Sequence, residues 1–171
     1  MNQIAVVDYG MGNLRSVAKA LEHVAPKANV VIAADAQTMR AADRVVFPGQ
    51  GAMPDCVREM DARGLREPLL AAAASKPFLG LCIGLQMLFE FSEEGDTPGL
   101  GLLAGRVERF RDNDMHDRQG HKLKVPHMGW NQVHIRRKSP LLAGLAENAY
   151  FYFVHSYYVV CDDSSAVALE A

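Results

Sequence analysis

Short apolar runs alternate with helical patterns over the first part of the chain. The run Ile4–Val7 is rich in β-branched residues and ends at a glycine-containing loop. Leu14, Val17 and Leu21 follow at the spacing of one helical face. This order predicts a strand, a loop and a helix.

The same order continues downstream. Further strands are predicted over 30–33, 44–47 (closed by Pro48-Gly49) and 77–81. Helices are predicted after a capping Asp35, over 53–74 with an interruption near Gly64, and over 83–91. Unbroken apolar strands separated by helices are typical of a parallel sheet covered on both faces. We therefore predict a doubly wound α/β fold with a mainly parallel sheet.

The pattern changes beyond Gly105. Strands without long intervening helices are predicted over 106–110, 122–125, 131–135 and 151–160, with a polar hairpin or loop over 112–120. This part should be largely antiparallel. Because the length suits one core and no repeat or linker interrupts the sequence, we predict a single domain over 1–171.

Charge, cysteine spacing and hydrophobic segments exclude several classes of function. A net charge of −2 gives no general attraction for nucleic acid or anionic lipid. The cysteines, Cys56, Cys82 and Cys161, lie far apart and have no metal-ligand spacing, so we predict neither a disulfide framework nor a zinc site. We also predict no cofactor and no other metal. The N-terminus has no secretion signal and no segment has the length of a membrane span, which predicts a cytoplasmic protein.

The main chemical candidate is Cys82, where the last parallel strand meets a helix. Gly80 and Gly84 stand two residues on either side of it, which is the pattern of a nucleophile elbow. Such an elbow strains the backbone of the nucleophile, and bulky neighbours would collide with adjacent elements. The helix start would favour a thiolate and supply the N–H of Ile83 to an oxyanion. The alternative is a small apolar residue that ends a buried strand.

A second glycine cluster, Gly49-Gln50-Gly51, ends the preceding strand. Small residues here would let a backbone N–H approach a substrate, and a peptide flip could complete an oxyanion hole. By itself the Pro-Gly pair more often indicates an ordinary turn at the end of a strand. Its pairing with Cys82 favours the functional interpretation.

These residues carry a resemblance to a known family. The segment Gly80-Leu81-Cys82-Ile83-Gly84-Leu85-Gln86 resembles the nucleophile segment of class I, or triad-type, glutamine amidotransferases. Segments 8–14, 126–131 and 151–158 are similar to those of the glutaminase subunits of imidazole glycerol phosphate synthases, which act in histidine biosynthesis. The resemblance covers essentially the whole chain.

The resemblance implies roles for particular residues. Cys82 would attack the side-chain amide of glutamine, and the ammonia would pass to a cyclase subunit with a (βα)₈ barrel as partner. The oxyanion hole would comprise Gly49, Gln50, Gly51 and Ile83. The glutamine pocket would comprise Gln86, His155, Ser156 and Tyr157, the last three largely through backbone groups. The cyclase interface would comprise Met128, Trp130 and Asn131.

The sequence departs from the family pattern at two places. Gln50 stands where the family usually has valine, and the His-Pro-Glu segment that carries the family's catalytic His and Glu does not occur. We therefore expect the 171 residues alone to be nearly inactive. Residues 167–171 have the pattern of a strand that begins there, so we expect the natural chain to continue.

Other residues receive simpler interpretations. His155 is the alternative base within the chain, although the resemblance assigns its backbone rather than its ring to the pocket. Solvated histidines are predicted at 116, 121, 127 and 134, and Cys56 and Cys161 are interpreted as packing residues. Two other functions stay open: a non-catalytic binding subunit, and an unrelated cysteine hydrolase on the same fold.

Overall fold

The computed structural model describes residues 2–111, 116, 120 and 123–171. The chain divides into two compact units, Met1–Leu103 and Ala104–Ala171. The first holds a parallel sheet and the second holds antiparallel strand pairs, so the predicted α/β class and the change of pattern near Gly105 are confirmed.

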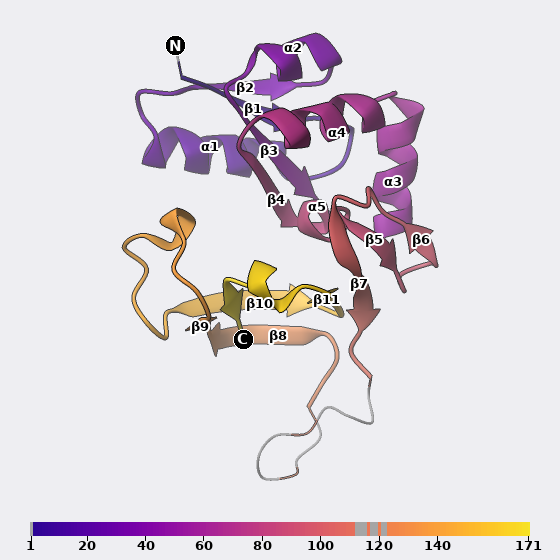
Figure 1. Ribbon diagram of the computed structural model, residues 1–171, viewed down its shortest axis with the longest axis vertical. Helices are drawn as coiled ribbons and strands as arrows, with labels where there is room; N and C mark the ends of the chain where they lie inside the picture. Colours follow the sequence, from indigo (N-terminus) through magenta and orange to yellow (C-terminus); the bar gives the residue numbers. More distant parts are fainter. Residues whose placement is uncertain (1, 112–115, 117–119, 121–122) are drawn as a thin grey trace. The chain divides into compact units, whose positions relative to one another are not determined.

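The first unit is built on a parallel sheet (Figure 1). Its strands are β1 (Gln3–Val7), β2 (Asn29–Ala33), β3 (Arg44–Gly49) and β4 (Phe78–Cys82). The order β2-β1-β3-β4 places β3 beside β4. This pairing brings the two predicted glycine clusters to the same end of the sheet, because parallel strands end together.

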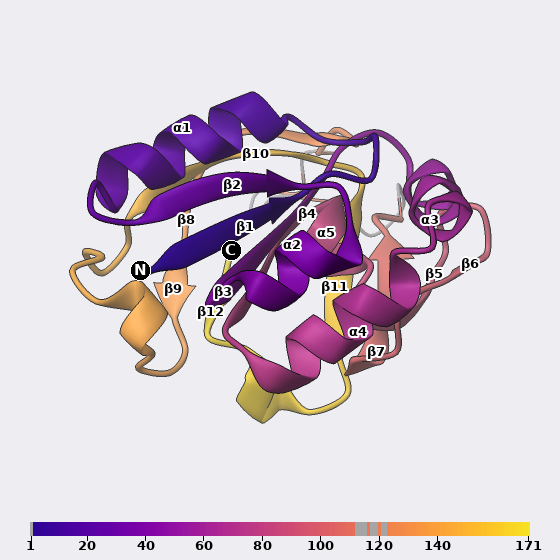
Figure 2. The ribbon, with the colours of Figure 1, turned by 90° about the horizontal axis from the view of Figure 1, so that it is seen from above.

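Helices cover both faces of this sheet. Figure 2 shows α1 (Leu14–Val24) on one side and α2 (Ala36–Ala41) and α4 (Arg66–Ser75) on the other. Successive strand residues point to opposite faces. Ile4, Val6 and Val46 pack with apolar residues of α1. Ala5, Val7, Val45 and Phe47 pack with buried residues of α2, α3 (Met53–Ala62) and α4. The doubly wound prediction is thereby confirmed.

Local signals set several helix boundaries. Asn13 accepts from the Ser16 N–H at 3.3 Å at the start of α1. Asp35 caps α2 as predicted, accepting from the Thr38 N–H at 2.8 Å, and this hydrogen bond lowers the pKa of its carboxyl. The predicted helix over 53–74 is interrupted near Gly64, between α3 and α4.

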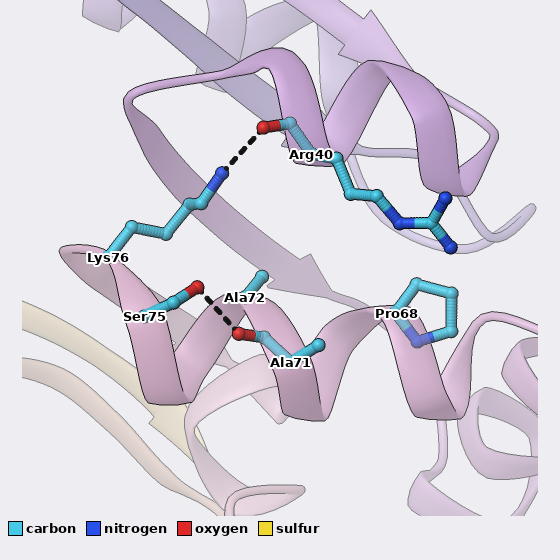
Figure 3. Close-up of a pocket in the computed structure, with 6 residues that line it drawn as sticks. All are labelled: Arg40, Pro68, Ala71, Ala72, Ser75 and Lys76. Carbon is cyan, nitrogen blue, oxygen red and sulfur yellow. Dashed lines mark hydrogen bonds between the residues drawn. The ribbon is translucent and has the colours of Figure 1, made fainter.

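Lys76 joins α2 to the end of α4. Its ammonium donates to the carbonyl oxygens of Met39, Arg40 and Ala42 at 3.1, 2.9 and 2.7 Å. A recess of about 170 Å³ beside it is lined by Arg40, Pro68, Ala71, Ala72, Ser75 and Lys76 (Figure 3). Lys76 precedes β4 whereas Cys82 ends it, so this recess lies at the opposite end of the strand from the candidate nucleophile.

The predicted helix over 83–91 is wrong beyond its first turn. Helix α5 (Ile83–Gln86) is short, and the chain then enters β5 (Phe89–Ser92), which pairs antiparallel with β6 (Thr97–Pro98). The turn between these strands contains Gly95 and Asp96, both with positive φ. A Gly-Asp turn is a hairpin signal that outweighs the helical spacing of the apolar residues.

The second unit consists mainly of antiparallel pairs, as predicted (Figure 1). Strand β7 (Leu103–Arg109) pairs with β11 (Tyr157–Cys161). Strand β8 (His127–Gln132) pairs with β10 (Tyr150–His155), and β9 (His134–Ile135) pairs with β12 (Leu169–Glu170). Short 3-10 turns are η1 (Pro140–Leu142) and η2 (Ser164–Ala166).

Three strand predictions in this unit need correction. Residues 123–126 are irregular and β8 begins only at His127, because Pro126 has no N–H for a ladder; Lys122 lies outside the described residues. The predicted strands over 131–135 and 151–160 are each divided, near Val133 and at Ser156. At both breaks the strand partner changes. Strand β8 pairs with β10 but β9 with β12, and β10 pairs with β8 but β11 with β7. The predicted polar loop over 112–120 falls largely outside the described residues.

In the described part of the chain, no helix is long and apolar enough to cross a membrane.

Candidate functional site

Cys82 occupies the turn between β4 and α5 with a strained backbone. Its φ of 55° and ψ of −118° lie in a region that non-glycine residues rarely adopt. The residue is exposed, whereas Ile83 directly after it is buried. The predicted nucleophile elbow is thus present in the structure, and the interpretation of Cys82 as a buried strand-ending residue is wrong.

The glycines beside Cys82 make this turn possible. A Cβ on Gly84 would lie 1.9 Å from the Phe47 carbonyl oxygen on the neighbouring strand. A Cβ on Gly80 would lie 2.7 Å from the Gly84 carbonyl oxygen in the following helix. Both neighbours are backbone atoms, which cannot move aside as a flexible side chain can. Glycine is therefore required on both sides of Cys82, as the pattern predicted.

The second glycine cluster lies directly beside Cys82. Gly49 is in register with Cys82 across the β3–β4 pairing, and a Cβ on Gly49 would lie 2.6 Å from the Gly84 backbone nitrogen. Gly51 has a φ of +99°. The segment Gly49-Gln50-Gly51 and the start of α5 therefore both adjoin the Cys82 backbone. An oxyanion hole at this place would need backbone N–H groups of these segments to point to one position.

Gln86 lies in the same short helix as Ile83. Its side chain is buried, with 8% of its surface exposed. Its Oε1 has no hydrogen-bond partner among the described residues. Because a buried acceptor without a donor costs free energy, this oxygen is a candidate to bind a donor from a ligand.

His155, Ser156 and Tyr157 lie together in the second unit. They span the break between β10 and β11. The His155 Nδ1 donates to the Tyr157 carbonyl oxygen at 2.8 Å, since a carbonyl only accepts. The His155 Nε2 lies 3.2 Å from the His127 Nδ1 and is therefore the acceptor of that pair. Both nitrogens of the His155 ring have partners within this unit.

His127 is not the solvated histidine that was predicted. It is partly buried and stacks on Phe153 with ring centroids 5.0 Å apart. Burial, with a smaller contribution from His155, lowers its pKa below the ordinary value. His116 and His134 are exposed, as predicted, and His121 lies outside the described residues.

Comparison with known proteins places this geometry in a family. Residues 5–169 match the family described as Glutamine amidotransferase class-I. The chain belongs to this family. A similar protein is the imidazole glycerol phosphate synthase subunit HisH of Aromatoleum aromaticum, 61% identical over the whole of this chain and 81% of that protein. The subunit of the same name from Nitrosospira multiformis is 60% identical over the same shares.

A solved structure shares the amidotransferase fold. A protein described as a glutamine amidotransferase superposes with a TM-score of 0.69 at 16% identity. The match covers 98% of this chain and 79% of that one. At this identity the match supports the fold alone, in agreement with the parallel sheet and the elbow.

Three residues near the candidate site were not among its predicted members. Tyr9 and Cys56 are fully buried in the core cluster that also contains Ile83, and the Cys56 thiol donates to the Gln50 carbonyl oxygen at 3.4 Å. Glu94 accepts from the Met53 N–H at 2.8 Å, where α3 begins after the oxyanion segment. Only the buried Tyr9 had a signal in the sequence, as part of the segment 8–14.

The residues predicted for a partner interface do not all share a face. Met128 and Trp130 are 63% and 69% exposed and lie opposite Val154 and Tyr152 in the β8–β10 ladder. Val154 and Tyr152 are also exposed, so the four form one apolar face, here called the β8–β10 face. Asn131 is exposed but points to the opposite side of β8, because strand residues alternate.

Proposed function

We propose that this chain is the glutaminase subunit of an imidazole glycerol phosphate synthase, in which both compact units act as one amidotransferase domain. The observation that carries the proposal is the exposed Cys82 in its strained elbow, in register with Gly49. The relatives that are 60% and 61% identical over the full chain support the particular synthase.

The reaction follows from the elbow. The Cys82 sulfur attacks the side-chain amide carbon of glutamine, the C–N bond breaks, and the thiol proton leaves with the nitrogen as ammonia. Water then cleaves the thioester, which gives glutamate and restores the thiol. Both steps place negative charge on the carbonyl oxygen, which N–H groups of Gln50 or Gly51 and of Ile83 would stabilise. No cofactor takes part.

Recognition of glutamine would involve Gln86 and, as the family resemblance implies, backbone groups of residues 155–157. The unpaired Gln86 Oε1 is suited to accept from an amine or amide N–H of the substrate. His155, Ser156 and Tyr157 would contribute backbone groups. Because both ring nitrogens of His155 have partners, the backbone role is favoured over a role as base.

The base and acid are not assigned within the chain. The sequence contains no His-Pro-Glu segment. Removal of one triad member typically lowers turnover by several orders of magnitude. We therefore expect the 171 residues alone to hydrolyse glutamine very slowly while Cys82 stays reactive toward glutamine analogues.

The partner would be the cyclase subunit, which consumes the ammonia in the cytoplasm. Ammonia protonates in water and loses nucleophilicity, so direct transfer between subunits has a chemical purpose. The β8–β10 face supplies an exposed Trp130 beside Tyr152, with ring centroids 5.6 Å apart. Aromatic residues of this kind are enriched at protein interfaces.

The test of function measures labelling and turnover together. The chain is mixed with the cyclase subunit and its acceptor ligand, then treated with a chloroketone analogue of glutamine. We expect glutamine-protected labelling of Cys82, none in Cys82→Ala, and no change in Cys161→Ala, the matched control. Labelling with slow glutamate release supports a glutaminase whose base lies outside residues 1–171. Labelling that glutamine does not prevent would refute the proposal in favour of an unrelated cysteine hydrolase.

A separate measurement tests the partner. Trp130→Ala should weaken binding of the cyclase subunit by about tenfold or more, as expected for a central aromatic anchor. Leu141→Ala removes a residue of similar exposure, 74%, in η1 and serves as the control. Equal affinities for both variants and the parent chain, measured by titration calorimetry, would show that the β8–β10 face is not the interface.

A further inference from the structure

The backbone of the oxyanion segment is tied to the helix that follows it. The Cys56 thiol in the first turn of α3 donates to the Gln50 carbonyl oxygen at 3.4 Å. The Cys56 N–H donates to the Ala52 carbonyl oxygen at 3.1 Å. One residue therefore holds two carbonyls of the segment that links β3 to α3.

The surroundings of this thiol are buried and tightly packed. Cys56 and Tyr9 have no exposed surface, and Tyr9 packs on Phe47 with ring centroids 5.3 Å apart. The Tyr9 hydroxyl has no hydrogen-bond partner of normal geometry in the described part of the chain. Burial raises its pKa far above the ordinary value, and the neighbouring thiols of Cys56 and Cys82 add to this effect. A buried setting strengthens the one thiol-to-carbonyl bond, because water does not compete for the carbonyl.

The Cys56 thiol stays protonated in this setting. Burial raises its pKa, which keeps the S–H available as a donor. The phenol beside it is also neutral. The Gln50 carbonyl therefore always has a hydrogen-bond donor, the buried Cys56 thiol. The Gln50 residue itself is exposed.

We propose that Cys56 is a positioning residue for glutamine hydrolysis, whose buried thiol anchors the Gln50 carbonyl and holds the Gly49-Gln50-Gly51 backbone beside Cys82. Glycines on both sides of Gln50 leave this backbone free to rotate. A fixed carbonyl limits the rotation of the peptide planes that present N–H groups to the oxyanion. This inference rests on the proposed function.

The test compares three side chains at position 56. Cys56→Ser keeps a donor, Cys56→Val keeps apolar bulk without a donor, and Cys56→Ala has no donor and cannot overpack. Cys161→Val is the matched control at the other non-nucleophilic cysteine. Packing alone would favour valine over serine, whereas an anchor favours serine over valine.

The readout is the rate of Cys82 alkylation by the glutamine chloroketone, divided by its rate with iodoacetamide. Both rates are measured by mass spectrometry of the Cys82 peptide, with the cyclase subunit and acceptor ligand present. The ketone oxygen occupies the oxyanion position, whereas iodoacetamide forms no oxyanion there. The ratio therefore reports the oxyanion hole and is insensitive to general exposure of the thiol.

We expect Cys56→Val and Cys56→Ala to lower this ratio by about tenfold, less than the loss of a whole oxyanion donor, which costs ~100-fold or more. Cys56→Ser should stay within about threefold of the parent. An unchanged ratio in both the valine and alanine variants, or an equal fall in the serine variant, would overturn the inference alone. If the parent chain shows no glutamine-protected labelling, the proposed function fails and this inference fails with it.

Discussion

Replacement of Gly84 by alanine tests whether the elbow depends on the close approach of two backbones. The added Cβ would lie 1.9 Å from the Phe47 carbonyl oxygen and 2.9 Å from its carbon, whereas real Cβ contacts essentially never fall under 3.0 Å. Strand β3 and helix α5 would have to separate by about 1 Å at a fully buried position. Interiors are close-packed, so such a shift disturbs the neighbouring core as well.

The expected loss in the free energy of unfolding follows from this steric overlap. Overpacking of a core costs typically about 1–3 kcal/mol, and an overlap between backbone atoms belongs at the upper end or beyond. Alanine favours a helix by about 1 kcal/mol over glycine, which offsets only part of the cost. We expect a net loss of about 2 kcal/mol or more. For a chain of this length that loss lowers the melting temperature by roughly 4–8 °C.

Differential scanning calorimetry and chloroketone labelling of Cys82 together check this prediction. Gly101→Ala is the control, because nothing lies within 4 Å of its added Cβ and its φ of +64° alone costs about 1 kcal/mol. Gly84→Ala should melt lower than the control and label more slowly, whereas the control should label at the parent rate. A Gly84→Ala chain that melts within about 2 °C of the parent and labels normally would refute the steric reasoning.

Two further predictions concern stability. Lys76→Met removes an ammonium that donates to three carbonyls, so the free energy of unfolding measured in urea should fall by about 2 kcal/mol. Lys19→Met, the control at an exposed ion pair, should lower it by less than ~0.5 kcal/mol. Equal losses would contradict the capping role of Lys76. The pKa of His127 is lowered in the folded state, so the neutral ring is the form that the fold favours. The contribution of this ring to the stability of the fold is therefore complete above the ordinary pKa of 6.5 and is lost as the pH falls below that value. His127→Phe should therefore reduce the fall in melting temperature between about pH 7 and about pH 5. The control His134→Gln should leave that fall unchanged. Identical curves of melting temperature against pH for the parent and His127→Phe would show that His127 does not cause the fall.

The elbow at Cys82 could be predicted because its signal is local. An elbow needs a strand, a reactive residue and a helix start, with small residues two positions away on each side, and all of these are adjacent in the sequence. The structure adds the reason for each glycine: Gly84 meets β3, and Gly80 meets α5. The glycine cluster at 49–51 could also be found in the sequence, although its register with Cys82 follows from strand pairing.

Predictions failed where a partner elsewhere in the chain decided the conformation. The apolar spacing after Cys82 fits a helix, but residues 89–92 pair with a second strand across a Gly-Asp turn. His127 lies in a polar-looking segment, yet it becomes partly buried because β10 brings His155 and Phe153 against it. No local pattern predicts such pairings.

The sequence by itself determined the order of the parallel strands and their helices in the first unit, the change to antiparallel pairs, the elbow at Cys82 and the family. These depend on hydrophobic period and on residues that are neighbours along the chain. The tertiary structure alone decided that Cys56 reaches the Gln50 carbonyl, that Gln86 is buried with a free acceptor, and that Asn131 faces away from Trp130. These properties depend on which backbone groups and faces meet in space, and that is settled only when the strands and helices have packed.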